Sequence, residues 1–183
     1  MPDIKQWKKR SLFDPRYVGV ERRKSRNWAF LLLGSVVLTI FIQNNVISGG
    51  IIVDKSMYPT LKEGEYYLIN KYIFHFAHPQ RGDIVVLFPW KYAAEEYVKR
   101  VVGLEGETLL IRNGTVYING RPLSEPYAVG STDPNIGPTV IPKGKCFVLG
   151  DNRTNSMDSR QFGAVESENI QGKIKPGEWF PLR

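Results

Sequence analysis

The chain has 183 residues, 42% of them hydrophobic, and its formal net charge is +7. That length suits one domain of ordinary size with an appendage, and so high an apolar fraction excludes a wholly disordered chain. The single cysteine, Cys146, excludes an intrachain disulfide and a cysteine-based zinc cluster, and we expect it to pack as a small hydrophobic residue in a strand.

The positive charge is concentrated at the start of the chain. Residues 1–27 hold nine Lys or Arg against three Asp or Glu, a net charge of +6, which leaves only +1 for the rest. A basic arm of this kind is typical of proteins that bind nucleic acid or anionic lipid. The segment that follows the arm decides between these two partners.

Residues 28–47 predict a transmembrane anchor. The run "WAFLLLGSVVLTIFI" carries no charge, and "QNNVI" extends it to the 20 residues that a bilayer core about 30 Å thick requires. Because Lys and Arg favour the cytoplasmic flank, we expect the amino terminus inside, the chain after Ile47 outside, and lipid rather than nucleic acid as the arm's partner. The alternatives are a buried helix of a soluble protein and a cleavable signal peptide, although no A-x-A-like site follows the apolar run.

Beyond the anchor, residues 48–183 predict a mainly β domain. Short runs rich in β-branched and aromatic residues alternate with turns. Asn113-Gly114 joins two runs as a tight hairpin turn should, and Asn119-Gly120 predicts another turn. Residues 121–144 contain five prolines and are expected to form a long surface excursion. The predicted strands are residues 66–70, 83–88, 96–102, 108–112, 115–118 and 146–150.

Ser56, in "DKSMYPTLKEG", is the candidate nucleophile, and it needs a neighbouring base to take its proton. Histidine is the usual base, but the chain has only His75 and His78, and no serine has the G-x-S-x-G surroundings of a nucleophile elbow. Two histidines without nearby Cys or acid pairs are also a weak metal site. The sequence therefore favours a base other than histidine.

Lys99, in "EYVKRVVGLEG", is the second candidate base. Burial among the neighbouring valines would disfavour its charged form and lower its pKa. On an alternating strand, one of Lys99 and Arg100 faces the core and the other faces away. Taken alone, however, the segment favours two solvated charges on an edge strand.

Four ordered segments resemble the sequence boxes of bacterial type I signal peptidases. They are "SMYPTL" (56–61), "RGDIVVLF" (81–88), "YVKRVVG" (97–103) and "GDNRTNSMDSRQFG" (150–163), and the resemblance covers most of the chain. It implies an antiparallel β domain of the signal-peptidase type preceded by one transmembrane helix. The implied activity is that of a serine endopeptidase that cleaves signal peptides from exported preproteins after small residues.

The resemblance also implies where the protein works and which residues do the chemistry. It implies a single-pass protein of the bacterial inner membrane that acts without a metal, a cofactor or an obligate protein partner. Ser56 matches the nucleophile and Lys99 the general base of a Ser-Lys dyad. The supporting residues that it implies are Ser156, which orients the lysine, Asp151, which pairs with Arg100, and the structural ion pair of Asp158 and Arg160.

Asp54 departs from the family pattern, in which Ser or Gly commonly stands two residues before the nucleophile and such a serine donates to the oxyanion. A carboxylate accepts hydrogen bonds rather than donating them. We therefore expect Asp54 to face away from the oxyanion and either pair with Lys55 or cap a turn. In "GLEGE", Glu105 stands where proline is common, and we expect it to change only a turn.

Other functions fit part of the sequence. A soluble self-cleaving Ser-Lys repressor would carry a DNA-binding helical domain in place of the anchor, which residues 1–27 do not provide. A specialised relative that processes one dedicated exported substrate would keep all four segments. A non-catalytic membrane-anchored module would keep the scaffold, and Asp54 lends weight to that alternative.

Overall fold

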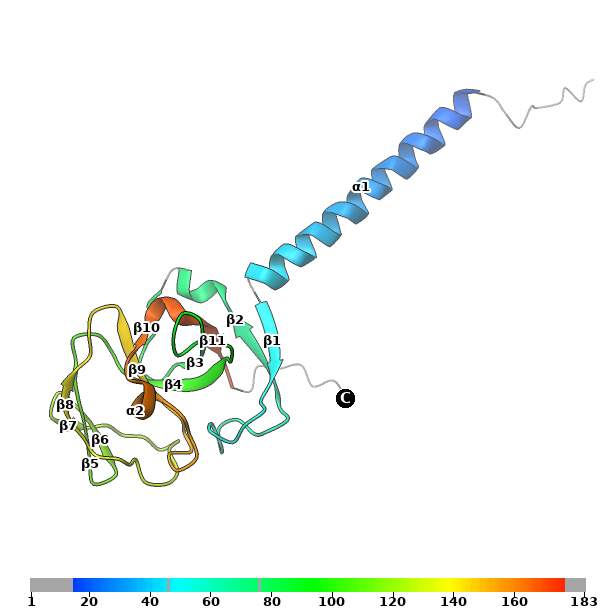
Figure 1. Ribbon diagram of the computed structural model, residues 1–183. Coiled ribbons are helices and arrows are strands. Elements are labelled where there is room, and N and C mark those ends of the chain that lie inside the picture. The colour runs from blue at the N-terminus through cyan, green and yellow to red at the C-terminus, as the bar shows by residue number, and fades with distance from the viewer. Residues whose placement is uncertain (1–14, 46, 76, 177–183) are drawn as a thin grey trace, which may run out of the picture. The chain divides into compact units, whose positions relative to one another are not determined.

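The computed structural model describes residues 15–45, 47–75 and 77–176 (Figure 1). The chain divides into two units, Met1–Gln43 and Asn44–Arg183. The described part of the first unit lies within the helix α1 (Pro15–Asn45), whose last two residues fall in the second unit. The helix begins within the basic arm and takes in most of the predicted anchor. The remainder of the arm, residues 1–14, lies outside the described residues.

The apolar side chains of α1 are exposed on all sides of the helix. Between Trp28 and Ile42, each large hydrophobic side chain is 40% to 67% exposed. They include the four consecutive residues 30–33, which together point around the whole helix axis. No helix in the described part of the chain is long and apolar enough to cross a membrane. The anchor and the orientation that the sequence indicates therefore remain predictions.

The second unit is built from antiparallel strands, which confirms the mainly β fold expected from the sequence. Its larger sheet has the order β1-β2-β11-β3-β4-β9-β10. The predicted strands at 66–70, 83–88, 96–102 and 146–150 are all present in it, shifted by no more than a residue at either end. Its strands are β1 (Ile47–Ile51), β2 (Tyr66–Asn70), β3 (Ile84–Leu87), β4 (Tyr97–Gly103), β9 (Lys145–Leu149), β10 (Val165–Glu166) and β11 (Ile170–Ile174).

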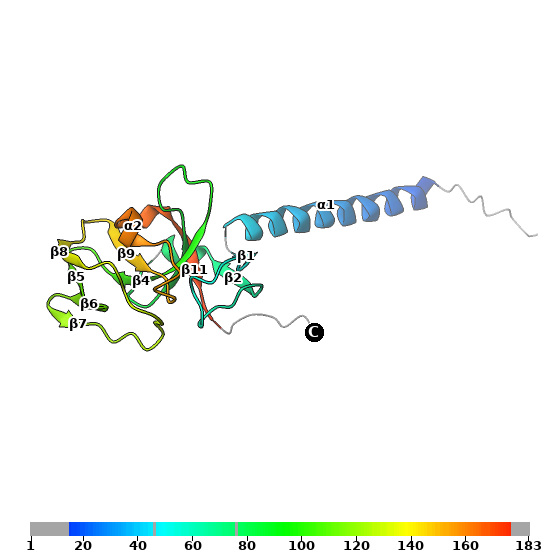
Figure 2. The same ribbon diagram turned by 60° about the horizontal axis from the view of Figure 1, so that its bottom comes forward.

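A smaller sheet, of order β7-β6-β5-β8, lies at the end of this unit away from β1 and β2 (Figures 1 and 2). Asn113 and Gly114 have φ angles of 50° and 75°, the left-handed conformation that a tight hairpin turn between β5 and β6 requires. The predicted hairpin is therefore confirmed. The strands are β5 (Thr108–Arg112), β6 (Thr115–Ile118), β7 (Arg121–Pro122) and β8 (Ile136–Val140).

Five strands, β1, β7, β8, β10 and β11, were not predicted from the sequence. For β8 and β11 the reason is local. β8 falls within the proline-rich stretch expected to be a surface excursion, and it is mostly exposed because it pairs only with β5 at the sheet edge. β11, "IQGKI", carries a central glycine, which weakens a strand signal. The tertiary structure nevertheless places β11 between β2 and β3. The short helices are η1 (Tyr72–His75), α2 (Ser159–Phe162) and η2 (Ser167–Asn169).

The alternation of β3 and β4 separates two parts of the core. Val86 packs into a cluster with residues of the loop after β1, whereas Val85 and Val101 pack into a cluster with β9. Cys146 is buried in that second cluster, as the sequence predicted, and burial raises the pKa of its thiol to about 12. β3 and β4 thus form a rigid centre from which Lys99 can project.

Gly172 in β11 allows a close approach that any side chain would block. A Cβ atom there would lie 2.4 Å from Ile69 Cγ2 and 2.7 Å from the Asn70 carbonyl oxygen. We expect Gly172→Ala to lower the free energy of unfolding by about 1–3 kcal/mol, the usual cost of overpacking. Gly137→Ala, where a Cβ would meet no atom within 4 Å, is the matched control. Equal urea midpoints for the two variants would contradict this prediction.

Candidate active site

Ser56 lies in the loop between β1 and β2, and the core holds that loop from both ends. The Ile52 N–H donates to the Glu65 carbonyl at 2.9 Å, and the Gly64 N–H donates back to the Ile52 carbonyl at 2.8 Å. Met57, next to the serine, is fully buried in the cluster that includes Val86. Ser56 itself is 3% exposed, so its hydroxyl is held at a defined place.

A second loop, after β9, packs directly against the serine. The Asn152 N–H donates to the Ser56 carbonyl at 2.9 Å, and the Asn152 side-chain amide donates to the Lys55 carbonyl at 3.1 Å. At Gly150, a Cβ atom would lie only 2.6 Å from that Ser56 carbonyl. Glycine is therefore required for the two loops to meet.

Lys99 reaches Ser56 from β4, which is paired on both sides by β3 and β9. It is 0% exposed, and its Nζ lies 2.6 Å from Ser56 Oγ and 3.0 Å from the Val98 carbonyl oxygen. The alternative of solvated charges on an edge strand is therefore wrong. Strand alternation sends Lys99 toward the serine and Arg100 to the opposite face.

The surroundings of Lys99 change the balance between its two protonation states. Burial, the largest influence, lowers the pKa of Lys99 below its ordinary value, while the carboxylates of Asp54, Asp158 and Asp151 act in the opposite direction. Removing water from an ammonium disfavours its charge more than these carboxylates restore it. The buried amine is thus shifted toward the neutral form that can accept a proton.

Asp54 lies against the serine, contrary to the expectation that it faces away. Its Oδ1 accepts hydrogen bonds from the Ser56 N–H at 3.0 Å and from the Ser56 hydroxyl at 2.9 Å. The bond to the N–H two residues on is the turn that Asp side chains favour, so the turn-capping part of the expectation holds. Lys55 pairs with Glu63 instead, at 3.7 Å.

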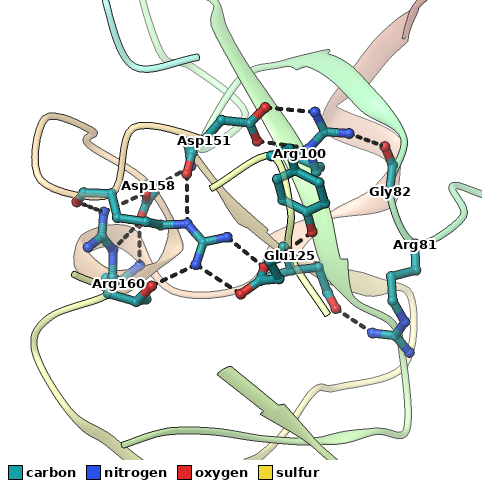
Figure 3. A network of polar contacts seen from close by, with 12 residues as sticks. Arg81, Gly82, Arg100, Glu125, Asp151, Asp158 and Arg160 are labelled. Atoms are coloured by element: carbon teal, nitrogen blue, oxygen red, sulfur yellow. Dashed lines mark hydrogen bonds and ion pairs between the residues drawn. The ribbon is translucent and has the colours of Figure 1, made fainter. Parts of the chain in front are cut away.

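Arg100 and Asp151 form a buried two-pronged ion pair (Figure 3). Arg100 Nε and Nη2 donate to the two Asp151 carboxylate oxygens at 2.8 Å and 2.6 Å. The Thr60 hydroxyl donates to the same carboxylate, and the Tyr127 ring centroid lies 3.9 Å from the guanidinium carbon. This cluster joins the Ser56 loop to β4 and to the loop after β9.

Asp158 and Arg160 form a second ion pair, in which Arg160 Nε and Nη2 lie 2.8 Å and 2.9 Å from the two Asp158 oxygens (Figure 3). Asp158 also caps the first turn of α2 and accepts the Gly150 N–H at 3.0 Å. Arg160 donates onward to the Arg153 carbonyl at 2.7 Å. The pair therefore holds the loop that packs against Ser56 by hydrogen bonds to Gly150 and Arg153.

Ser156 does not make the hydrogen bond to Lys99 that the sequence resemblance implies. Its hydroxyl is buried and has no hydrogen-bond partner within the part of the chain that the structure describes. The Lys99 amine is instead directed at Ser56 and the Val98 carbonyl. Ser156 stands close to Gly150, where a Cβ atom would lie 2.2 Å from its hydroxyl oxygen, so it borders the site without contacting the amine.

The histidines stand apart from these contacts. His78 is exposed, and the side chain of His75 lies outside the described residues. The described hydrogen bonds of the Ser56 hydroxyl are those with Lys99 and Asp54. Among the side chains that the structure describes, no three His, Cys, Asp or Glu residues are grouped to hold a metal ion.

Several contributors to the site were not predicted from the sequence. Thr60 and Tyr127 complete the Arg100 cluster, and Arg153 forms a buried pair with Glu125 beside it. Thr60 lies within the segment "SMYPTL", and Arg153 within the last of the four segments. Tyr127 and Glu125 lie in the proline-rich stretch and carry no local signal of a site.

With this geometry established, comparison with known proteins identifies the family. The family model described as "Signal peptidase, peptidase S26" matches residues 25–179. The chain belongs to this family. It is therefore a hydrolase of the signal peptidase class, and a serine protease.

Individual members of the family are similar over most of this chain. A "Signal peptidase I" of Bacillus amyloliquefaciens is 36% identical over 168 residues, which are 84% of this chain and 86% of that protein. "Signal peptidase I T" of Bacillus subtilis (strain 168) is 37% identical over 159 residues, 81% and 82% of the two chains. A crystal structure of a signal peptidase I from Enterococcus faecalis V583 is 35% identical, with a TM-score of 0.48, and the match covers 54% of this chain and 98% of that one.

The lowered pKa of Lys99 predicts a particular dependence of stability on pH. Between the folded-state pKa and the ordinary value of 10.5, the unfolded chain binds a proton that the folded protein does not, so the free energy of unfolding rises with pH in that window. We expect Lys99→Met, which lacks this effect, to be more stable than the wild type near neutral pH.

The difference in free energy of unfolding between Lys99→Met and the wild type should narrow as pH approaches 10.5. Urea denaturation at several pH values measures this difference. Lys62→Met, which removes an exposed lysine, is the matched control and should not show this pattern. A difference between Lys99→Met and the wild type that does not vary with pH would contradict the prediction.

Proposed function

We propose that the protein is a membrane-anchored serine endopeptidase that uses Ser56 and Lys99 to cleave signal peptides from exported preproteins after small residues. The observation that carries the proposal is the buried contact of 2.6 Å between Lys99 Nζ and Ser56 Oγ. Membership of the signal peptidase family and the printed names of the relatives support the substrate.

The proposed reaction begins with neutral Lys99. Its amine removes the Ser56 proton as Oγ attacks the scissile carbonyl carbon of the preprotein, and a covalent acyl-enzyme forms when the peptide bond breaks. The resulting lysinium gives its proton to the leaving amine. Lys99 then takes a proton from the water that attacks the acyl-enzyme, and Ser56 regains its hydroxyl when the product leaves.

The buried ion pairs support this chemistry by holding the two loops in place. The Arg100–Asp151 pair is linked to the Ser56 loop by the Thr60 hydroxyl, and Asp158 of the second pair accepts the Gly150 N–H. Their role is positional, because each carboxylate is already matched by an arginine. Small displacements of a nucleophile from its base reduce catalysis strongly.

Two features of the first unit favour the proposed attachment to the lipid bilayer, with the amino terminus in the cytoplasm and the β unit outside. The apolar side chains between Trp28 and Ile42 face outward around the helix, an arrangement typical of a helix surrounded by apolar material. The net charge of +6 on residues 1–27 favours the cytoplasmic side. Such anchoring would hold enzyme and signal peptide on one surface and raise their effective concentration.

Two alternatives remain distinct from this proposal. A non-catalytic anchored module would gain nothing from a lysine amine buried against a serine hydroxyl, because burying the amine costs stability. A relative dedicated to one exported substrate would keep the same site. Expression in a bacterium depleted of its own signal peptidase distinguishes a general enzyme from a dedicated one. A general enzyme restores processing of many preproteins, and a dedicated one does not.

Ser56→Ala and Lys99→Ala should each abolish cleavage of a preprotein by the detergent-solubilised protein, because nucleophile and base act as one unit. The double variant should be little worse than either single variant, as expected for residues that act together. Lys99→Arg should also fail, since arginine stays protonated. Cleavage is measured by the appearance of the mature product on a gel.

The control for these variants is Lys62→Ala, which removes an exposed lysine outside the site and should cleave normally. Unfolding curves establish that the inactive proteins are folded. Activity close to that of the wild type in either Ser56→Ala or Lys99→Ala would exclude the proposed dyad.

The anchor makes an independent prediction about the full chain in bacterial cells. The protein should remain with the membrane after alkaline carbonate washing, since an apolar helix in a bilayer is not released by removing charge interactions. In spheroplasts, a tag at the amino terminus should resist added protease, whereas a tag at the carboxyl terminus should be digested. Release by carbonate, or digestion of the amino-terminal tag alone, would contradict the proposed topology.

A further inference from the structure

The contact between Asp54 and the nucleophile points to a role that the proposed function leaves unexplained. We propose that Asp54 is a positioning residue that holds Ser56 and Lys99 in a resting, unreactive arrangement, which must be released before each acylation. The proposal rests on the proposed function, because it concerns the same serine and lysine. One oxygen atom, Asp54 Oδ1, accepts hydrogen bonds from both the N–H and the hydroxyl of Ser56.

The hydroxyl of Ser56 has two neighbours but only one proton. Lys99 Nζ lies 2.6 Å from Oγ, and Asp54 Oδ1 lies 2.9 Å from it. An ionised carboxylate can only accept, so the contact with Asp54 requires the hydroxyl to donate in that direction. Lys99 must then be the donor to Oγ. In this arrangement the hydroxyl proton points away from its base.

The protonated form of Lys99 fits this arrangement best. A lysinium donates to Oγ while the hydroxyl donates to Asp54, and the chain of hydrogen bonds ends on a negative charge. The carboxylate of Asp54 therefore favours the form of Lys99 that cannot accept a proton, in agreement with its direction of influence on the pKa of Lys99. The reactive form is the neutral amine, with the hydroxyl turned toward it.

Among the carboxylates that influence Lys99, Asp54 differs from the others in its partners. Asp151 is paired with Arg100, and Asp158 with Arg160, so each of those charges is matched nearby. Within the described residues, no arginine or lysine lies within ion-pair distance of Asp54. The ring centroid of Tyr97 also lies 5.3 Å from Nζ. Asp54 is therefore the carboxylate at the dyad that no arginine matches, and its charge acts on Lys99.

Asp54 also occupies the backbone donor beside the nucleophile. Its Oδ1 accepts the Ser56 N–H at 3.0 Å. An N–H in this position is suited to stabilise the negative oxygen that develops when Oγ attacks a carbonyl. A substrate carbonyl cannot share that donor at full strength with a carboxylate, and two negative oxygens there would repel. The side chain of Asp54 must turn away for the reaction to proceed.

The exposure of Asp54 makes such a turn feasible. The residue is exposed, unlike Ser56 and Lys99, and its described hydrogen bonds are those to Ser56. In the proposed step, lysinium loses one proton to solvent, the Asp54 carboxylate rotates into water, and the Ser56 hydroxyl turns to donate to the neutral amine. The substrate carbonyl oxygen then takes over the Ser56 N–H.

The decisive variant is Asp54→Asn, which removes the charge but keeps a side-chain oxygen able to accept the Ser56 N–H in the same turn. Only neutral lysine accepts the serine proton, so kcat/KM for a preprotein or signal-peptide substrate should rise with pH through the titration of Lys99. We expect this rising limb to move to lower pH in Asp54→Asn. Glu166→Gln, which removes an exposed carboxylate paired with Lys145, is the matched control and should leave the limb in place.

A second measurement reports on the dyad without depending on turnover. The Lys99 side chain can be titrated by NMR in the full chain labelled with 13C at the lysine Cε, with the signal assigned by its absence in Lys99→Met. The Lys99 titration should move to lower pH in Asp54→Asn and not in Glu166→Gln. If no variant cleaves any preprotein, the proposed function fails, and this titration still decides the role of Asp54.

A further variant tests the occupied backbone donor. Asp54→Ser removes the carboxylate and adds a hydroxyl that can donate, so kcat above the rising limb should increase by about 10²-fold, the typical effect of one oxyanion donor. The proposal is overturned if the limb and the Lys99 titration of Asp54→Asn coincide with those of the wild type. It is also overturned if folded Asp54→Asn loses activity at every pH, since the carboxylate would then assist the reaction.

Discussion

The site depends on a lysine amine held out of water against a serine hydroxyl. Lys99 is fully buried, and its Nζ lies 2.6 Å from Ser56 Oγ. Burying an amine disfavours its charged form, so the fold lowers the pKa of a group that in water would be protonated and useless as a base. Burying this amine lowers the free energy of unfolding of the protein. A central strand can sustain the loss because β3 and β9 hold β4 by hydrogen bonds on both sides.

The charges around the amine divide into two kinds. Asp151 and Asp158 are each held by an arginine in a two-pronged pair, and they connect the loops that meet at Gly150. These pairs position the site while adding little net charge to it. Asp54 has no such cation and contacts the nucleophile directly. Its carboxylate is therefore the feature that distinguishes the resting geometry from the reactive one.

Much of the β unit could be predicted because its signals are local. The strand at 115–118 and the Asn113-Gly114 turn follow from residue preferences that act within a few positions. β8 and β11 could not be predicted in this way, since one contains proline and the other glycine, and each is stabilised by its partner strands. The candidate pair Ser56 and Lys99 was identified because four segments resemble the sequence boxes of signal peptidases in the same order. The number of residues between the two does not indicate their distance in space.

The sequence by itself determined the family, the basic arm, the apolar segment and the residue types available for chemistry. Only the tertiary structure decided the orientation of single side chains. It turned Asp54 toward Ser56, left the Ser156 hydroxyl without a partner, and brought Tyr127 over Arg100. The physical reason is that a strand or turn preference is set by nearby residues, whereas a hydrogen bond depends on which loops the packed core brings within about 3 Å of one another.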